Sequence, residues 1–243
     1  MKKGTLRQIL LITDGCSNQG EDPVAMAALA REYGMTVNVI GVLEENERTD
    51  GLKEIENIAL SGGGIHQLVY ARQLSHTVQM VTRKAMTQTI QGFIHKELQT
   101  ILGSDKEIED LPPEKRGQVV EVVDDLGETM DLEVLILIDT SASMQHKLPT
   151  VEDALLDLSI SLHSRIGQNE YSLYAFPGRK KQVERLMDWT PQMKDIHKIF
   201  PKLSSGGVTP TGPALKEAID AYQKKRSKRG MLEDDGFIEE SGS

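Results

Sequence analysis

Short apolar runs alternate with longer amphipathic segments along the first hundred residues. The apolar runs are rich in β-forming residues and are typical of buried strands, over residues 6–13, 35–43 and 65–71. A helix is predicted after each run. Over residues 22–33 the signals are Asp22 as N-cap, Pro23 at the first helical position and Gly34 at the end. Over residues 52–60 and 75–102, apolar residues recur with the spacing of one helix face. This part of the chain therefore predicts the order β-α-β-α-β-α.

The same alternation returns after residue 131. Residues 132–138 form the most continuous apolar run and predict a buried strand. A β-hairpin is predicted around the turn Pro177-Gly178-Arg179-Lys180, and helices are predicted over residues 150–165, 191–200 and 210–222. Strands that alternate with helices predict an α/β fold, a doubly wound and mainly parallel sheet with helices on both faces.

Two segments depart from this pattern. Residues 104–131 contain ten acidic and three basic residues around Pro112-Pro113, which predicts a connector. Its valines between 119 and 123 fit a helical period but individually favour a strand, so both remain open. Residues 226–243 are basic, then acidic and rich in Gly and Ser, which predicts a disordered tail. The basic run at 224–229 is interpreted as solvated rather than as a phosphate contact.

Composition limits the class of protein and the chemistry. With 243 residues, 38% hydrophobic and 27% charged, the chain is typical of a soluble globular protein. It has no apolar run of membrane-spanning length and no signal-peptide pattern, so we expect a cytoplasmic location. Cys16 is the only cysteine, which excludes an internal disulfide and a zinc site built from several thiolates. The net charge of -9 argues against nucleic acid as a partner.

Candidate chemistry gathers where predicted strands end. The strand ending near residue 138 is followed by Asp139-Thr140-Ser141-Ala142-Ser143, which places one carboxylate and two hydroxyls in a single turn. A hard cation such as Mg²⁺ takes about six oxygen ligands, so this turn is a partial shell. Further oxygen donors are available in Thr209, within Gly-Gly-Val-Thr-Pro-Thr-Gly, and in Asp14, within Ile-Thr-Asp-Gly.

These three motifs, DTSAS, GGVTPTG and ITDG, resemble the three parts of the metal-ion-dependent adhesion site of von Willebrand factor A (VWA) domains. The resemblance implies that Mg²⁺ or Mn²⁺ is held by Asp139, Ser141, Ser143, Thr209 and Asp14. It also implies that an acidic residue of a partner protein completes the metal shell. Taken alone, the serine turn has a simpler interpretation as a helix cap.

The order of the motifs differs from that of the family, in which the aspartate strand comes last. Here the order is restored if the chain is read as a circle, so the resemblance implies one circularly permuted VWA domain over residues 1–225. Residues 1–103 would be the C-terminal half of the usual order and residues 132–225 the N-terminal half, with 104–131 joining the original ends. We expect a monomer; the alternative is a dimer in which two chains exchange halves.

The function implied is a cytoplasmic, metal-dependent protein-binding module. We do not expect an enzyme, because the motifs offer no general base or nucleophile beyond the proposed ligand carboxylates. One alternative is a metal-assisted phosphoesterase that uses Asp139 and Asp14. Another is a subunit that docks on an AAA+ ATPase or a kinase-linked complex. The sequence is also similar to stand-alone VWA proteins of spore-forming bacilli, which implies a role in sporulation.

Overall fold

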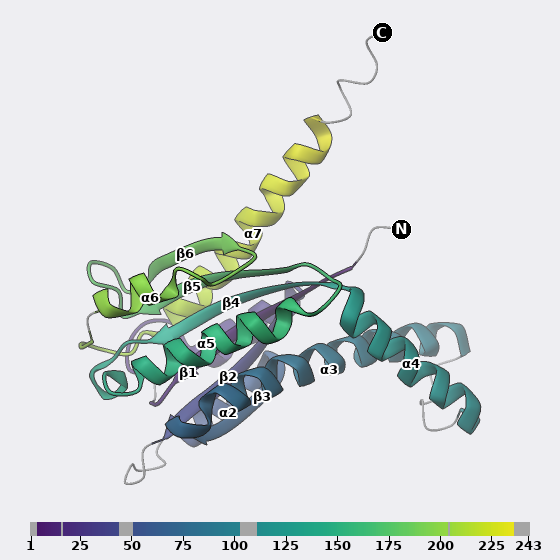
Figure 1. Cartoon of the computed structure of the whole chain (residues 1–243), viewed down its shortest axis with the longest axis horizontal. Helices are drawn as coiled ribbons and strands as arrows, with labels where there is room; N and C mark the ends of the chain where they lie inside the picture. Colours follow the sequence, from purple (N-terminus) through teal and green to yellow (C-terminus); the bar gives the residue numbers. More distant parts are fainter. Residues whose placement is uncertain (1–3, 16, 44–50, 103–110, 204, 236–243) are drawn as a thin grey trace.

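Six strands form one sheet in the order β3-β2-β1-β4-β5-β6 (Figure 1). The computed structural model describes residues 4–15, 17–43, 51–102, 111–203 and 205–235. The strands are β1 Thr5–Thr13, β2 Thr36–Leu43, β3 Gly63–Tyr70, β4 Asp131–Asp139, β5 Asn169–Phe176 and β6 Glu184–Thr190. The first five are parallel and β6 is antiparallel to β5. The predicted mainly parallel sheet and its hairpin are therefore confirmed.

Helices cover both faces of this sheet. Their bounds are α1 Pro23–Glu32, α2 Leu52–Ser61, α3 Leu74–Leu102, α4 Pro113–Thr129, α5 Leu148–His163, α6 Ile196–Ile199 and α7 Thr211–Asp235. Short 3-10 turns follow β3, β4 and α6, as η1 Ala71–Gln73, η3 Ala142–Met144 and η4 Phe200–Lys202. None of the helices in the described part of the chain is long and apolar enough to cross a bilayer.

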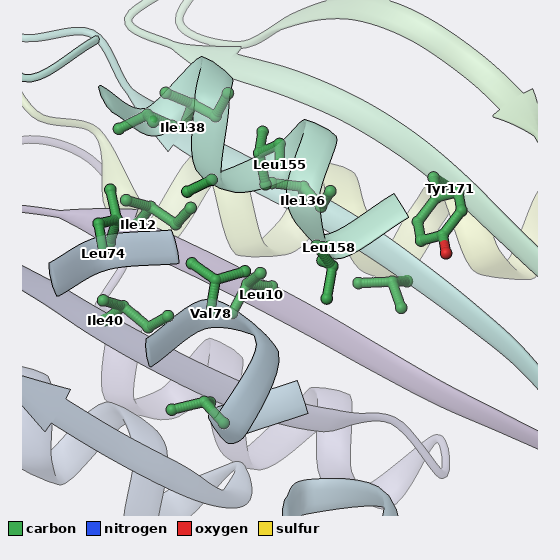
Figure 2. Packing of buried hydrophobic residues seen from close by; sticks show 14 of the residues in the cluster. Leu10, Ile12, Ile40, Leu74, Val78, Ile136, Ile138, Leu155, Leu158 and Tyr171 are labelled. Atoms are coloured by element: carbon green, nitrogen blue, oxygen red, sulfur yellow. The ribbon is translucent and has the colours of Figure 1, made fainter. Parts of the chain in front are cut away.

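Two cores result from the alternation of side chains along the central strands. On one face, Leu10 and Ile136 pack with the buried sides of α3 and α5 (Figure 2). On the other face, Leu11 and Leu137 pack with α1, α2 and α7. Because successive side chains of a strand point to opposite faces, a run such as residues 132–138 must be apolar throughout when both faces are covered.

The acidic connector is largely a helix rather than an extended linker. Residues 113–129 form α4, which begins after Pro112 and packs against α3. Val123 is buried and Val119 and Leu126 pack against the same core, whereas Val120 and Val122 are exposed. The helical period of these positions therefore outweighs the strand preference of the individual valines. Residues 103–110 lie outside the described part of the chain.

The C-terminal helix is longer than predicted. The sequence predicts its end near residue 222 and a disordered tail from residue 226, but α7 continues to Asp235. The basic run belongs to this helix: Lys225 Nζ lies 3.0 Å from Glu133 and 2.7 Å from Glu170, and Arg229 lies 3.5 Å from Glu133. Lys and Arg are good helix formers, and these ion pairs hold their helix against the sheet. The disordered tail predicted from residue 226 is therefore wrong over residues 226–235, and residues 236–243 lie outside the described part of the chain.

The helix before the glycine-rich loop is shorter than predicted. The helix predicted over residues 191–200 is reduced to α6 and η4, which together span residues 196–202. Residues 191–195 precede α6 as a bend and a turn, and Pro201, which has no backbone N–H, lies within η4 and prevents α6 from continuing as an α-helix.

Candidate metal centre

The pairing of β1 with β4 brings the two site aspartates to one edge of the sheet. The strands run parallel and in register from Thr5 opposite Asp131 to Ile12 opposite Ile138. Both strands therefore end at the same edge, where the side chains that follow them meet. The Thr13 hydroxyl donates a hydrogen bond to Asp139 Oδ2 at 2.6 Å, which joins the two strand ends directly.

A continuous chain of hydrogen bonds runs through the turn after β4. The Ser141 backbone N–H donates to Asp139 Oδ1 at 2.8 Å. The Ser141 and Ser143 hydroxyls lie 3.2 Å apart, and the Ser143 hydroxyl donates to Asp14 Oδ1 at 2.8 Å. Asp139 and Ser141 are buried, whereas Ser143 is exposed. Four of the five predicted ligands thus form one connected group that reaches from the core to the surface.

Thr209 lies at the same edge and is held there by its backbone. Its N–H donates to Asn18 Oδ1 at 2.8 Å, and its carbonyl accepts from Asn18 N at 3.2 Å and from Ser17 Oγ at 3.3 Å. The preceding loop contacts the turn after β4, because Gly206 N donates to the Thr140 carbonyl at 3.1 Å. Thr209 therefore belongs to the same loop cluster as the other predicted residues.

Gly206 and Gly207 explain why this loop is glycine-rich. They have φ angles of 142° and 84°, a backbone conformation that other residues adopt only with strain. The hydroxyl of Thr211, two residues beyond Thr209, is buried and has no hydrogen-bond partner among the described residues. The loop thus carries a buried oxygen that the surrounding protein does not satisfy.

Lys147 is part of the site and was missed by the sequence analysis. Its Nζ lies 2.6 Å from Asp14 Oδ2, and both side chains are only 1% exposed. The available signal was its place in a helical stripe, since Met144, Leu148 and Val151 are buried at the neighbouring three- and four-residue spacings. A lysine in such a stripe needs a buried anion, and Asp14 supplies it.

Burial sets the protonation of Asp139. Removal from water raises the pKa of this carboxyl from 3.8 to about 6; the bonds from Thr13 and Ser141 lower the pKa, and the charge of Asp14 raises it. Asp139 is therefore ionised at neutral pH, and its burial in the charged form lowers the stability of the fold. A further carboxyl, Glu54, accepts a hydrogen bond from Ser17 N at 2.7 Å, and burial raises its pKa as well.

The donor set fits a hard divalent cation. It consists of two carboxylates and three hydroxyls, and oxygen ligands of this kind suit Mg²⁺ and Mn²⁺. The described residues hold no cluster of three or more His, Cys, Asp or Glu side chains able to bind a metal. A cation at this edge would therefore depend on the serine and threonine hydroxyls.

Comparison with known proteins identifies the relatives of this chain. Residues 134–232 match the von Willebrand factor type A domain. The chain is 62% identical over 236 residues to the uncharacterized protein YabS of Bacillus subtilis (strain 168), covering 97% of this chain and 96% of that protein. The chain belongs to the YabS family. The predicted VWA-type domain is confirmed for the matched segment, which contains Asp139, Ser141, Ser143 and Thr209 but not Asp14.

A solved structure extends the likeness to the fold of nearly the whole chain. It is the crystal structure of an uncharacterized protein from Alicyclobacillus acidocaldarius subsp. acidocaldarius DSM 446, with 38% sequence identity and a TM-score of 0.86. The match covers 92% of this chain and 96% of that one. The likeness therefore extends well beyond the segment that matches the VWA domain.

Proposed function

We propose that this member of the YabS family is a metal-dependent protein-binding module. In this proposal, Mg²⁺ or Mn²⁺ is held by Asp139, Ser141, Ser143, Thr209 and Asp14, and an acidic residue of a partner protein completes the metal shell. The observation that carries it is the hydrogen-bonded chain from Asp139 to Asp14, which gathers hard oxygen donors beside a VWA-type strand and turn. The exposed end of this chain, at Ser143, is open to a partner.

The charges of the site favour an anionic partner group. Two carboxylates balance one divalent cation, and the Lys147 ammonium then leaves one positive charge in excess. Neutral hydroxyls supply the remaining protein ligands, so the cation keeps much of its attraction for a further anion. An Asp or Glu side chain provides that anion as a hard oxygen ligand. The three motifs offer no nucleophile or general base beyond the proposed ligand carboxylates, and the nearby Glu54 already accepts a hydrogen bond from Ser17 N, so we propose binding rather than catalysis.

Asp14 divides its two oxygens between different tasks. Oδ2 accepts from the Lys147 ammonium and Oδ1 accepts from Ser143. We assign Oδ1 to the cation, because it is the oxygen that meets the serine turn. Lys147 then positions Asp14 and offsets the negative charge of its carboxylate, without contacting the partner.

The experiment measures metal binding first and partner binding second. Purified protein is titrated with Mg²⁺ and Mn²⁺ by calorimetry, alongside the Asp139→Ala variant and an Asp195→Ala control, whose carboxylate is exposed. All three proteins are then immobilised and used to capture a partner from a native extract, with divalent cation or with EDTA. We expect binding to be lost in EDTA and in Asp139→Ala, and kept in the control. Partner binding that survives both EDTA and Asp139→Ala would refute the proposal.

We also propose that the chain is a circularly permuted VWA domain. Two contacts support this. The strand that Asp14 follows, β1, lies directly beside β4, the strand that ends at Asp139. In addition, the Tyr222 hydroxyl of α7 lies 2.7 Å from the Gln8 carbonyl, so the last helix passes the start of β1. The order expected for the family would connect these two elements directly.

Reordering the gene tests the permutation. A chain that starts at Asp131, continues through α7 and is joined by a flexible linker to residues 4–102 should fold and keep its affinity for Mg²⁺. Circular dichroism and calorimetry provide the readouts, and a chain that fails to fold with linkers of several lengths contradicts the proposal. We further propose that the natural chain is a monomer; light scattering that gives the mass of a dimer would show exchange of halves instead.

A further inference from the structure

A basic groove lies between α7 and the hairpin of β5 and β6, and none of the candidate metal ligands lines it. Its volume is about 980 Å³, and seven Lys and Arg residues line it against three carboxylates. The whole chain carries a net charge of -9, so this surface reverses the sign of the protein's overall charge. Such a local reversal attracts anions that the rest of the surface repels.

Two walls of the groove present the positive charges. One wall is a single face of α7, where Glu217, Ala221, Lys224 and Lys228 follow three- and four-residue spacing. The opposite wall comes from the loop of the hairpin and from β6, with Arg179, Lys180, Lys181 and Arg185. Because α7 continues past residue 222 as a helix, its basic residues are held in a fixed row.

Some of these basic side chains form ion pairs within the described part of the protein and others do not. Lys225 is bonded to Glu133 and Glu170, and its Nζ lies 3.8 Å from the centre of the Trp189 ring. Arg185 pairs with Asp188 at 3.3 Å. By contrast, no acidic residue of the described part of the chain forms an ion pair with Lys180, Lys181, Lys224 or Lys228. These four exposed ammonium groups remain available to a ligand.

We infer that this groove binds an acidic polypeptide segment, independently of the metal site. Trp189, the one tryptophan of the groove, is half-buried; Lys225 lies over its ring and the tilted Tyr222 ring is 5.0 Å away at 56°, which limits the stacking of a base on it. Single-stranded nucleic acid depends on such stacking. The three carboxylates of the groove also oppose a closely spaced phosphate backbone, whereas Asp and Glu side chains can reach the lysines one by one.

The groove also continues towards the metal site. Arg179 lines both this groove and a neighbouring cavity of about 290 Å³, which is also lined by Thr140, between Asp139 and Ser141. One acidic segment could therefore extend from the groove towards the metal edge. The groove itself contains no candidate metal ligand, so binding there does not require the cation.

The test uses the full chain in EDTA and a fluorescein-labelled dodecaglutamate peptide. Fluorescence anisotropy measures its affinity, and the emission of Trp189, the only tryptophan, reports occupation of the groove. Two double variants reverse charge on opposite walls, Lys180→Glu/Lys181→Glu and Lys224→Glu/Lys228→Glu. The matched control is Lys84→Glu/Lys115→Glu, which reverses two exposed lysines on α3 and α4.

We expect each groove variant to weaken peptide binding about tenfold or more and the control to change it less than about twofold. The Asp139→Ala variant should bind the peptide as the natural chain does, which separates this site from the metal site. The inference is overturned by absence of peptide binding in EDTA or by an equal loss of affinity in the control. Tighter binding of a twelve-nucleotide single-stranded DNA than of the peptide would also overturn it, in favour of nucleic acid.

Discussion

Replacing Asp139 by asparagine should stabilise the metal-free protein and abolish its stabilisation by Mg²⁺. The carboxylate is buried at the end of β4, where ionisation is opposed by loss of water. Asparagine has the same shape and no charge. Its oxygen can accept from Ser141 N, and its amide can donate to the Thr13 hydroxyl, which lies 3.4 Å from the Gly15 carbonyl and can donate there instead.

The magnitude follows from the pKa. A rise from 3.8 to about 6 corresponds to about 3 kcal/mol at a pH well above 6, since one pKa unit is about 1.4 kcal/mol. The hydrogen bonds to a neutral amide are weaker than those to a carboxylate, which takes back roughly 1–2 kcal/mol. The Asp139→Asn variant should therefore be about 1–2 kcal/mol more stable than the natural chain at pH 7.5 in EDTA.

Urea denaturation followed by circular dichroism measures this difference, with EDTA and again with saturating Mg²⁺. Asp195→Asn is the control, because that carboxylate is 70% exposed and its change should stay within about 0.5 kcal/mol. If Asp139→Asn is less stable than the natural chain by more than about 1 kcal/mol in EDTA, burial of the Asp139 carboxylate does not cost stability and the reasoning is refuted. Equal stabilisation of both proteins by Mg²⁺ would refute Asp139 as a ligand.

Three further predictions concern the same structure. Protonated Asp139 stabilises the metal-free fold below about pH 4, and this contribution to stability is lost as pH rises through about 6. The affinity for Mn²⁺, measured by calorimetry, should change in the opposite sense, because the metal binds the ionised carboxylate; it should fall about tenfold per pH unit below 6. Lys147→Met leaves the Asp14 carboxylate buried without the ammonium that pairs with it, and denaturation in EDTA should show that the free energy of unfolding falls by about 3–5 kcal/mol. Tyr222→Phe removes a hydroxyl that contacts backbone groups of both β1 and β4, and denaturation should show a loss of about 1–3 kcal/mol.

Each of these has a matched comparison. Lys198→Met removes an exposed ion pair, so a loss equal to that of Lys147→Met would mean that burial of the Asp14 pair is unimportant. Tyr33→Phe removes the hydroxyl of a half-exposed ring and should change stability by less than about 0.5 kcal/mol. A pH-independent affinity for Mn²⁺ between pH 5 and 7.5 would contradict the role given to Asp139.

The sequence predicted the sheet well because its central strands are buried on both faces. A continuous apolar run such as residues 132–138 does not fit an amphipathic helix or a strand with one face in water. Asp139 marks the end of this strand, because a carboxylate is not placed inside the apolar layers of the sheet. Local signals also defined α1, where Asp22 accepts a hydrogen bond from Val24 N and Pro23 occupies the first turn.

Other features depend on contacts between distant residues and could not be predicted in this way. The helical stripe indicates that Lys147 is buried, but its partner is known only once the fold places Asp14, 133 residues away, against its ammonium. The extension of α7 depends on Glu133 and Glu170, which hold basic side chains that composition alone assigns to a tail. In both cases the deciding partner is a buried or half-buried carboxylate in a separate element.

The pairing of β1 with β4 also has a consequence for synthesis on the ribosome. The first strand can pair with β2 soon after both emerge, but its other edge waits for a strand that begins at Asp131. During that interval the nascent chain carries an unpaired apolar strand, which is prone to pair with other chains. Thr209 and Tyr222 emerge later still, so a growing chain cannot assemble the full set of candidate ligands until most of its length has been translated.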